Sequence, residues 1–113
     1  MSADLIMDIQ AMTAKLNTSI KMLRKTGAEY AEAERDYKVL LSQESLRLKD
    51  SGMAVTLIDK VVYGVRKVAD ARFRRDVAEA TYKANQESIN VLKLQIRIID
   101  NQIAREWGAP QST

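Results

Sequence analysis

The sequence predicts an all-α protein: a long, antiparallel, coiled-coil-like helical hairpin with a short corner helix, assembling into a helical-bundle oligomer. Three observations predict this. The chain has only 4 glycines and 1 proline in 113 residues, so few positions break a helix. Apolar residues recur at steps of three and four along two long segments. The second segment also carries a second apolar stripe, which one partner helix cannot cover.

The first helix is expected at about 3–49. Ser2 is a plausible N-cap, and Asp4 suits the positive end of the helix dipole. Gly27 lies inside the pattern and indicates either close packing or a bend. The stripe consists of Ile9, Met12, Leu16, Ile20, Leu23, Gly27, Tyr30, Glu34, Tyr37, Leu41, Glu44 and Leu48.

The corner of the hairpin is expected between two stop signals, Ser51–Gly52 and Gly64. A short helix at about 54–63 fits between them. Its apolar face consists of Leu57, Ile58, Val61 and Val62.

The second long helix is expected at about 67–107, followed by a tail at 108–113. Gly108 and Pro110 stand in the usual order for a helix end. Its main stripe consists of Val68, Arg72, Arg75, Ala78, Tyr82, Asn85, Ile89, Leu92, Ile96, Ile99, Ile103 and Trp107. Because isolated long helices gain little from propensity alone, the two long helices should pair. We expect one helical domain over 1–113.

Pairing the two helices from Lys49 and Lys67 outwards predicts which residues face each other. Glu44 falls opposite Arg72, so a buried charge finds a partner. The other expected neighbours are Ile20 with Ile96, Leu23 with Leu92, Leu16 with Ile99, and Glu34 and Tyr30 with Tyr82 and Asn85. The polar positions either fix the register, as in coiled coils, or bind a ligand.

The second stripe of the second long helix is the expected self-association face. Such an apolar strip is unusually large for a monomer, so a second copy should cover it. Partial cover by the corner helix, or docking on a different protein, are the alternatives. The stripe consists of Phe73, Val77, Ala80, Ala84, Val91, Leu94 and Ile98.

A basic, aromatic-containing cluster surrounds the start of the second long helix. Arginine binds phosphate bidentately and aromatic rings stack on bases, so the cluster suits a nucleotide, a nucleic acid strand or an acidic protein surface. The alternative is a solvated or ion-paired surface. The acidic segment 29–36 could neutralise it, but only between subunits in the expected register. The candidate residues are Lys60, Tyr63, Arg66, Lys67, Arg72, Arg74, Arg75, Tyr82 and Lys83.

Composition and motifs argue against catalysis. Cysteine and histidine are absent, which removes thiolate nucleophiles, disulfides and the usual zinc and haem ligands. No phosphate-binding loop or serine elbow occurs. We expect no enzyme, no cofactor and no metal. No segment reads as a membrane span, and the start "MSADLIMDIQ" has acids where a signal peptide has lysines, so we expect a cytoplasmic protein without a membrane partner.

Three stretches, "GMAVTLIDKVVYG", "ADARFRRDVAEATYKANQESIN" and "REWG", resemble a family of small all-helical proteins of phages and prophages of Gram-positive bacteria. The similarity covers most of residues 20–108. It implies a phage accessory protein acting in the host bacterial cytoplasm, and it implies no role for any single residue.

Three functions follow from that resemblance and the basic cluster. The first is a non-enzymatic protein that counters host defence, by sequestering a nucleotide immune signal or by blocking a defence protein. The alternative is an accessory protein of phage replication or recombination that binds single-stranded nucleic acid or a recombinase. The third is a coiled-coil adaptor or assembly factor.

Overall fold

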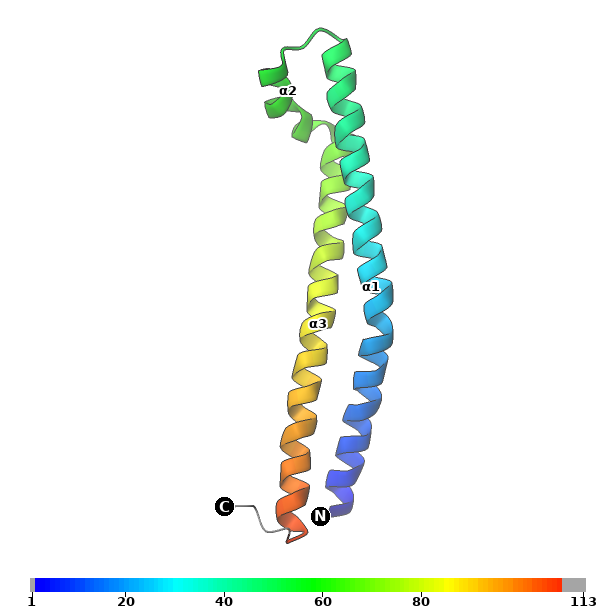
Figure 1. Ribbon diagram of the computed structural model, residues 1–113, viewed down its shortest axis with the longest axis vertical. Helices are drawn as coiled ribbons and strands as arrows, with labels where there is room; N and C mark the ends of the chain where they lie inside the picture. The colour runs from blue at the N-terminus through cyan, green and yellow to red at the C-terminus, as the bar shows by residue number, and fades with distance from the viewer. Residues whose placement is uncertain (1, 109–113) are drawn as a thin grey trace. The chain divides into compact units, whose positions relative to one another are not determined.

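The fold is an all-α helical hairpin, as the sequence predicts. The computed structural model describes residues 2–108. Helix α1 spans Ser2–Asp50 and helix α3 spans Arg66–Glu106, and the two pack antiparallel (Figure 1). Between them lie helix α2 (Val55–Val61) and a 3-10 turn, η1 (Val62–Gly64). The predicted capping by the Ser2 side chain, the role of Pro110 and the rest of the tail lie outside the described residues.

The chain divides into two compact units. The corner unit is Lys25–Tyr82 and contains the end of α1, α2, η1 and the start of α3. The terminal unit combines α1 up to Arg24 with α3 from Lys83 onward.

The corner unit has a core drawn from all four of its helical segments. Val68 is fully buried, and Ala71 is 2% exposed, so Ala71 occupies the core position that the sequence suggested for Arg72. Arg72 itself is exposed, because its charged guanidinium gains nothing from burial without a partner. The other core residues are Tyr37, Leu48, Ile58 and Val62, with Leu40, Leu41, Met53 and Val65 packed against them.

Helix α1 ends at the predicted Ser51–Gly52 stop. Gly52 has φ 93°, in the left-handed region that favours glycine. Its N–H donates to the carbonyl of Lys49 (3.0 Å), and the N–H of Met53 donates to the carbonyl of Leu48 (3.2 Å). This is the Schellman pattern, and Met53 completes it by packing against the core that contains Leu48.

The register of the hairpin differs from the prediction by a little more than one helical turn. Glu44 lies 4.0 Å from the Nζ of Lys67, not opposite Arg72. The physical reason is the corner: Ile58 and Val62 pack into the same core as Leu48, so α2 and η1 lie beside the end of α1. Helix α3 therefore begins further back along α1, as Figure 1 shows.

The terminal unit is built from α1 and α3 alone. Ile89 and Leu92 are its buried apolar residues, at 8% and 9% exposure. The side-chain amide of Asn85 donates to the backbone carbonyl of Ser19 (3.0 Å). The sequence predicted that Asn85 would lie beside Tyr30, which is about three turns of α1 away from Ser19. Ile20 is 47% exposed, so its expected burial against Ile96 is wrong.

Other predicted neighbours in the terminal unit are displaced as well. Leu23 shares a surface groove with Ile89, whereas Leu92 lies beside Ser19. Trp107, expected at the end of the main stripe, is 66% exposed. Gly108 has φ 69°, as expected of a glycine that ends a helix. Its N–H donates to the carbonyl of Arg105 (3.2 Å).

Candidate functional site

The predicted basic cluster is divided among several faces of the fold. Lys60 is exposed on α2, and Tyr63 lies on η1. Lys83 belongs to the terminal unit, where it lines a groove with Gln86 and Ile89. The remaining members lie on the first part of α3 in the corner unit: Arg66, Lys67, Arg72, Arg74, Arg75 and Tyr82.

Three of these cations, Arg66, Lys67 and Arg75, form ion pairs. Arg66 Nε lies 3.2 Å from Asp70 on the next turn of α3. Lys67 reaches the buried carboxylate of Glu44, which also accepts a hydrogen bond from Arg47. A buried carboxylate needs ionic or hydrogen-bond partners, so Lys67 helps to hold α3 against α1. These pairs favour the ion-paired interpretation of the cluster.

Two arginines lie over tyrosine rings. The guanidinium of Arg75 is 4.5 Å from the ring centre of Tyr37 and 2.8 Å from Asp76. The hydrogen bond to Asp76 raises the pKa of Arg75. The guanidinium of Arg72 is 5.6 Å from the ring centre of Tyr63. Cation–π contacts of this kind fix side-chain positions and join α3 to α1 and to η1.

Arg74 lies in an acidic groove within one chain. The groove, of about 350 Å³, brings Arg74 together with Glu29, Glu32 and Asp36 of α1. The expectation that segment 29–36 faces the basic cluster only across a subunit interface is therefore wrong. That expectation assumed the predicted helix register, and the observed register differs from it. Arg35 already pairs with Glu32 (3.8 Å) and Asp36 (3.1 Å), so part of this acidic charge is neutralised locally.

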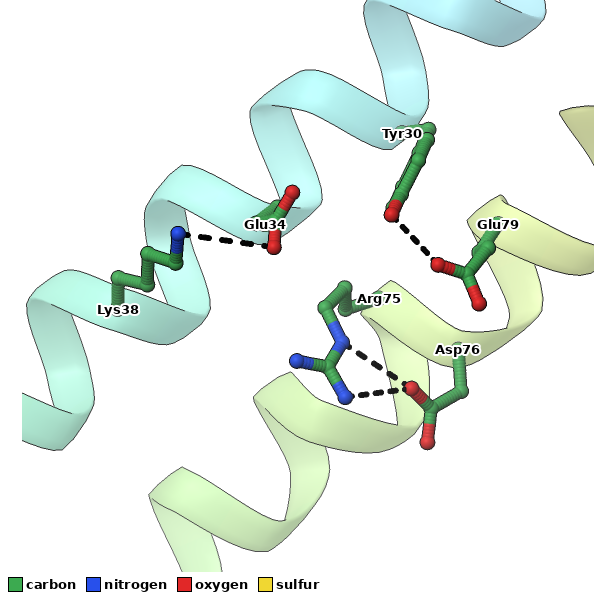
Figure 2. Close-up of polar contacts among 6 residues, drawn as sticks. All are labelled: Tyr30, Glu34, Lys38, Arg75, Asp76 and Glu79. Atoms are coloured by element: carbon green, nitrogen blue, oxygen red, sulfur yellow. Dashed lines mark hydrogen bonds and ion pairs between the residues drawn. The ribbon is translucent and has the colours of Figure 1, made fainter.

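Tyr30 and Tyr82, two members of the predicted polar layer, meet in the structure. Their ring centres are 6.0 Å apart, as the sequence placed them. The hydroxyl of Tyr30 donates to Glu79 Oε2 at 2.5 Å, and Figure 2 shows it pointing across from α1 to α3. This hydrogen bond, with burial second, raises the pKa of Tyr30 to about 12. Glu34 pairs instead with Lys38 on α1 (3.7 Å; Figure 2). The polar groups of Tyr30 and Glu34 are therefore paired with other residues of the same chain.

The sequence did not predict a groove of about 540 Å³ between α1 and α2, which we call the α1–α2 groove. Ile58 and Val62, both buried, form its floor. Leu46, Val55 and Tyr63 lie at its edge and are 59%, 62% and 44% exposed. Leu46 lies off the predicted core stripe of α1, which is the one sequence signal that pointed here. The polar lining is Ser42, Ser45, Lys49 and Asp59.

The predicted self-association stripe is exposed in the structure. Phe73 and Val77, in the corner unit, are 70% and 49% exposed. Ala80 and Ala84 are also exposed. In the terminal unit, the exposures are 44% for Val91, 52% for Leu94 and 54% for Ile98.

Residues 2–108 lack two further kinds of site. These residues contain no group of three or more acidic side chains placed to hold a metal ion. None of the described helices combines the length and the hydropathy needed to cross a bilayer.

Comparison of the chain with protein-family models, with curated proteins and with solved structures found no match.

Proposed function

We propose that this chain is a non-enzymatic binding protein that recognises an amphipathic helix of a partner protein in the α1–α2 groove. The observation that carries the proposal is the combination of a buried apolar floor with exposed apolar edges. Val55 and Leu46 leave more than half of their side-chain surface in water. Grooves of this kind accept the apolar face of a helix, whose side chains at successive turns fill the depression.

The polar lining of the groove favours a protein ligand over a polyanion. Lys49 supplies one positive charge and Asp59 one negative charge. Protein interfaces commonly have an apolar centre and a mixed polar rim. A phosphate-rich ligand needs several uncompensated cations instead.

The resemblance to phage proteins supports a host protein as the partner, so the groove would serve to block a defence protein in the bacterial cytoplasm. Sequestration of a nucleotide signal is the second form of this proposal. It has less support, because Arg66, Lys67 and Arg75 would have to leave Asp70, Glu44 and Asp76 to bind phosphate. Binding of a recombinase would use the same groove, whereas binding of single-stranded nucleic acid would again need the paired cations.

A photo-crosslinking amino acid at Val55 tests the proposal. In bacterial cells, we expect Val55 to yield an adduct of discrete mass with another protein, and Leu46→Glu to abolish it. The matched control places the same crosslinker at Lys60, which is exposed on α2 but does not line the groove. Equal adducts from both positions, or none from Val55, would overturn the proposal.

Heat stabilisation by added ligand tests the nucleotide form. A ligand at concentration L that binds only the folded chain stabilises it by RT ln(1 + L/Kd), so its melting temperature rises with the logarithm of the ligand concentration above Kd. A rise that follows this dependence with a nucleotide, and that is lost in Arg72→Glu, would assign the function to sequestration. A rise that disappears steeply with salt on single-stranded DNA would assign it to nucleic acid binding.

A further inference from the structure

Helix α3 carries two exposed apolar patches, one in each unit, whose positions in the sequence share one helical spacing. The corner-unit patch is Phe73, Val77 and Ala80, and the terminal-unit patch is Val91, Leu94 and Ile98. From Phe73 to Ile98 the positions follow alternating steps of four and three: 73, 77, 80, 84, 87, 91, 94 and 98. This is the spacing of a coiled-coil seam, and Glu87 is its one charged member.

We propose that the corner-unit patch of one chain packs against the terminal-unit patch of a second copy, so that two α3 helices pair antiparallel about a twofold axis. Val77 of each chain then faces Leu94 of the other, and Phe73 faces Ile98. A twofold axis forms each contact twice, because an isologous interface uses the same surface on both chains.

The sizes of the side chains favour this antiparallel register. Ala80 faces Val91 of the partner, so a small residue lies against a larger one. The largest side chain, Phe73, lies at the outer end of the seam, where it is also the most exposed of the stripe's large apolar residues, at 70%. Packing of small against large fills the space between two helices without voids.

The charges discriminate between the two directions. A parallel pairing in register places Glu87 opposite Glu87 of the partner, which buries two like charges together. The antiparallel pairing places Glu87 beside the partner's Ala84, next to its Lys83. It also brings Asp76 to Arg97 of the other chain on both sides of the axis, and both residues are exposed. Asp76 accepts from Arg75 within its own chain and has oxygen capacity for a second arginine.

The absence of cysteine makes disulfide trapping a clean test of direction. Purified Val77→Cys and Leu94→Cys proteins are mixed in equal amounts and oxidised, and the products are identified by intact mass. The proposal predicts the mixed Val77–Leu94 disulfide as the main product. A disulfide between two Val77→Cys chains indicates parallel pairing and would overturn it, as would the absence of any dimer.

The molecular mass of the protein in solution tests whether the exposed stripe of α3 is the dimer interface. Sedimentation equilibrium should give twice the 12.7 kDa mass of the chain. Leu94→Glu should convert the protein to a folded monomer, because Leu94 is 52% exposed and adds little to the core of its own chain. The matched control is Val39→Glu, which changes a similarly exposed apolar residue (48%) on α1 and should leave the dimer intact. The proposal would be wrong if the wild-type protein were monomeric, or if Leu94→Glu left the dimer unchanged.

The proposed pairing of Asp76 with Arg97 of the other chain is tested by reversing one charge and then the other. Arg97→Asp should raise the dimer Kd by about tenfold or more, because two attractive pairs become repulsive. Adding Asp76→Arg to the same chain should restore most of the affinity, whereas Asp70→Arg should not. Equal recovery from both second changes would show that net charge, and not this register, sets the affinity.

Discussion

The hydroxyl of Tyr30 on α1 donates a hydrogen bond to Glu79 on α3, 49 residues away in the sequence. A phenol that donates to a carboxylate is held in its protonated form, because the phenolate would face a second negative charge. The contact therefore joins the two long helices of the corner unit and leaves a signature in the titration of the protein.

Tyr30 should ionise late in an alkaline titration of the folded protein. Its pKa is raised from 10.0 to about 12, mainly by the hydrogen bond to Glu79. Because the folded pKa is the higher one, this contact stabilises the fold fully below pH 10, and the contribution is lost as the pH rises through 12. Ultraviolet absorbance of tyrosinate, followed together with circular dichroism, should resolve this late component.

Tyr30→Phe is the control for that titration. It should remove the component at about pH 12. Glu79→Gln should move the component back towards pH 10, because the amide lacks the charge that opposes ionisation. If no component appears at about pH 12 while the helices remain folded, the hydrogen bond does not form in solution.

Helical periodicity predicted most of this fold because α1 and α3 bury one stripe each. The spacing located Tyr37, Leu48 and Val68 correctly in the core. It could not locate the register, since any shift by a whole turn keeps both stripes facing each other. The register depends on how far Ile58 and Val62 carry the chain back along α1, and that distance is a property of the folded corner.

The candidate site was less predictable than the fold. Sequence neighbours such as Arg72, Arg74 and Arg75 point in different directions, because consecutive helical residues are about 100° apart. Arg75 therefore lies over Tyr37, while Arg74 lies in the acidic groove. The α1–α2 groove was missed because Leu46 and Val55 are separated by the stop at Gly52, and no periodicity crosses such a stop.

Gly52→Ala should destabilise the protein by about 1–2 kcal/mol, because a Cβ strains the left-handed backbone at φ 93°. Gly64→Ala is the matched control. A Cβ meets nothing within 4 Å at either glycine, and Gly64 does not have a positive φ. We expect a change of less than about 0.5 kcal/mol at Gly64 in urea unfolding. Equal effects at both positions would contradict a left-handed stop at Gly52.

Gly27 and Tyr82 should be energetically coupled. A Cβ at Gly27 would lie 3.1 Å from Cε1 of Tyr82, which is tighter than ordinary contact. Gly27→Ala should therefore stabilise α1 by about 1 kcal/mol only when Tyr82 is also replaced by alanine. With Tyr82 present, the gain should be smaller or reversed. A double-mutant cycle measures the difference, which we expect to exceed about 0.5 kcal/mol. Additive effects would mean that the two residues do not touch.

Arg75→Ala should destabilise the fold, whereas Arg74→Ala should not. Arg75 is 22% exposed, lies over the buried ring of Tyr37 and holds Asp76 through two nitrogens. Losing these contacts should cost about 1–2 kcal/mol in urea unfolding. Arg74 is exposed at the edge of the acidic groove, so its removal should stay within about 0.5 kcal/mol. Arg75→Lys should recover only part of the loss, because an ammonium cannot make the bidentate contact while lying flat on the ring. If the two alanine variants are equally stable, Arg75 does not stabilise the fold, and it would then be available to bind an anionic ligand.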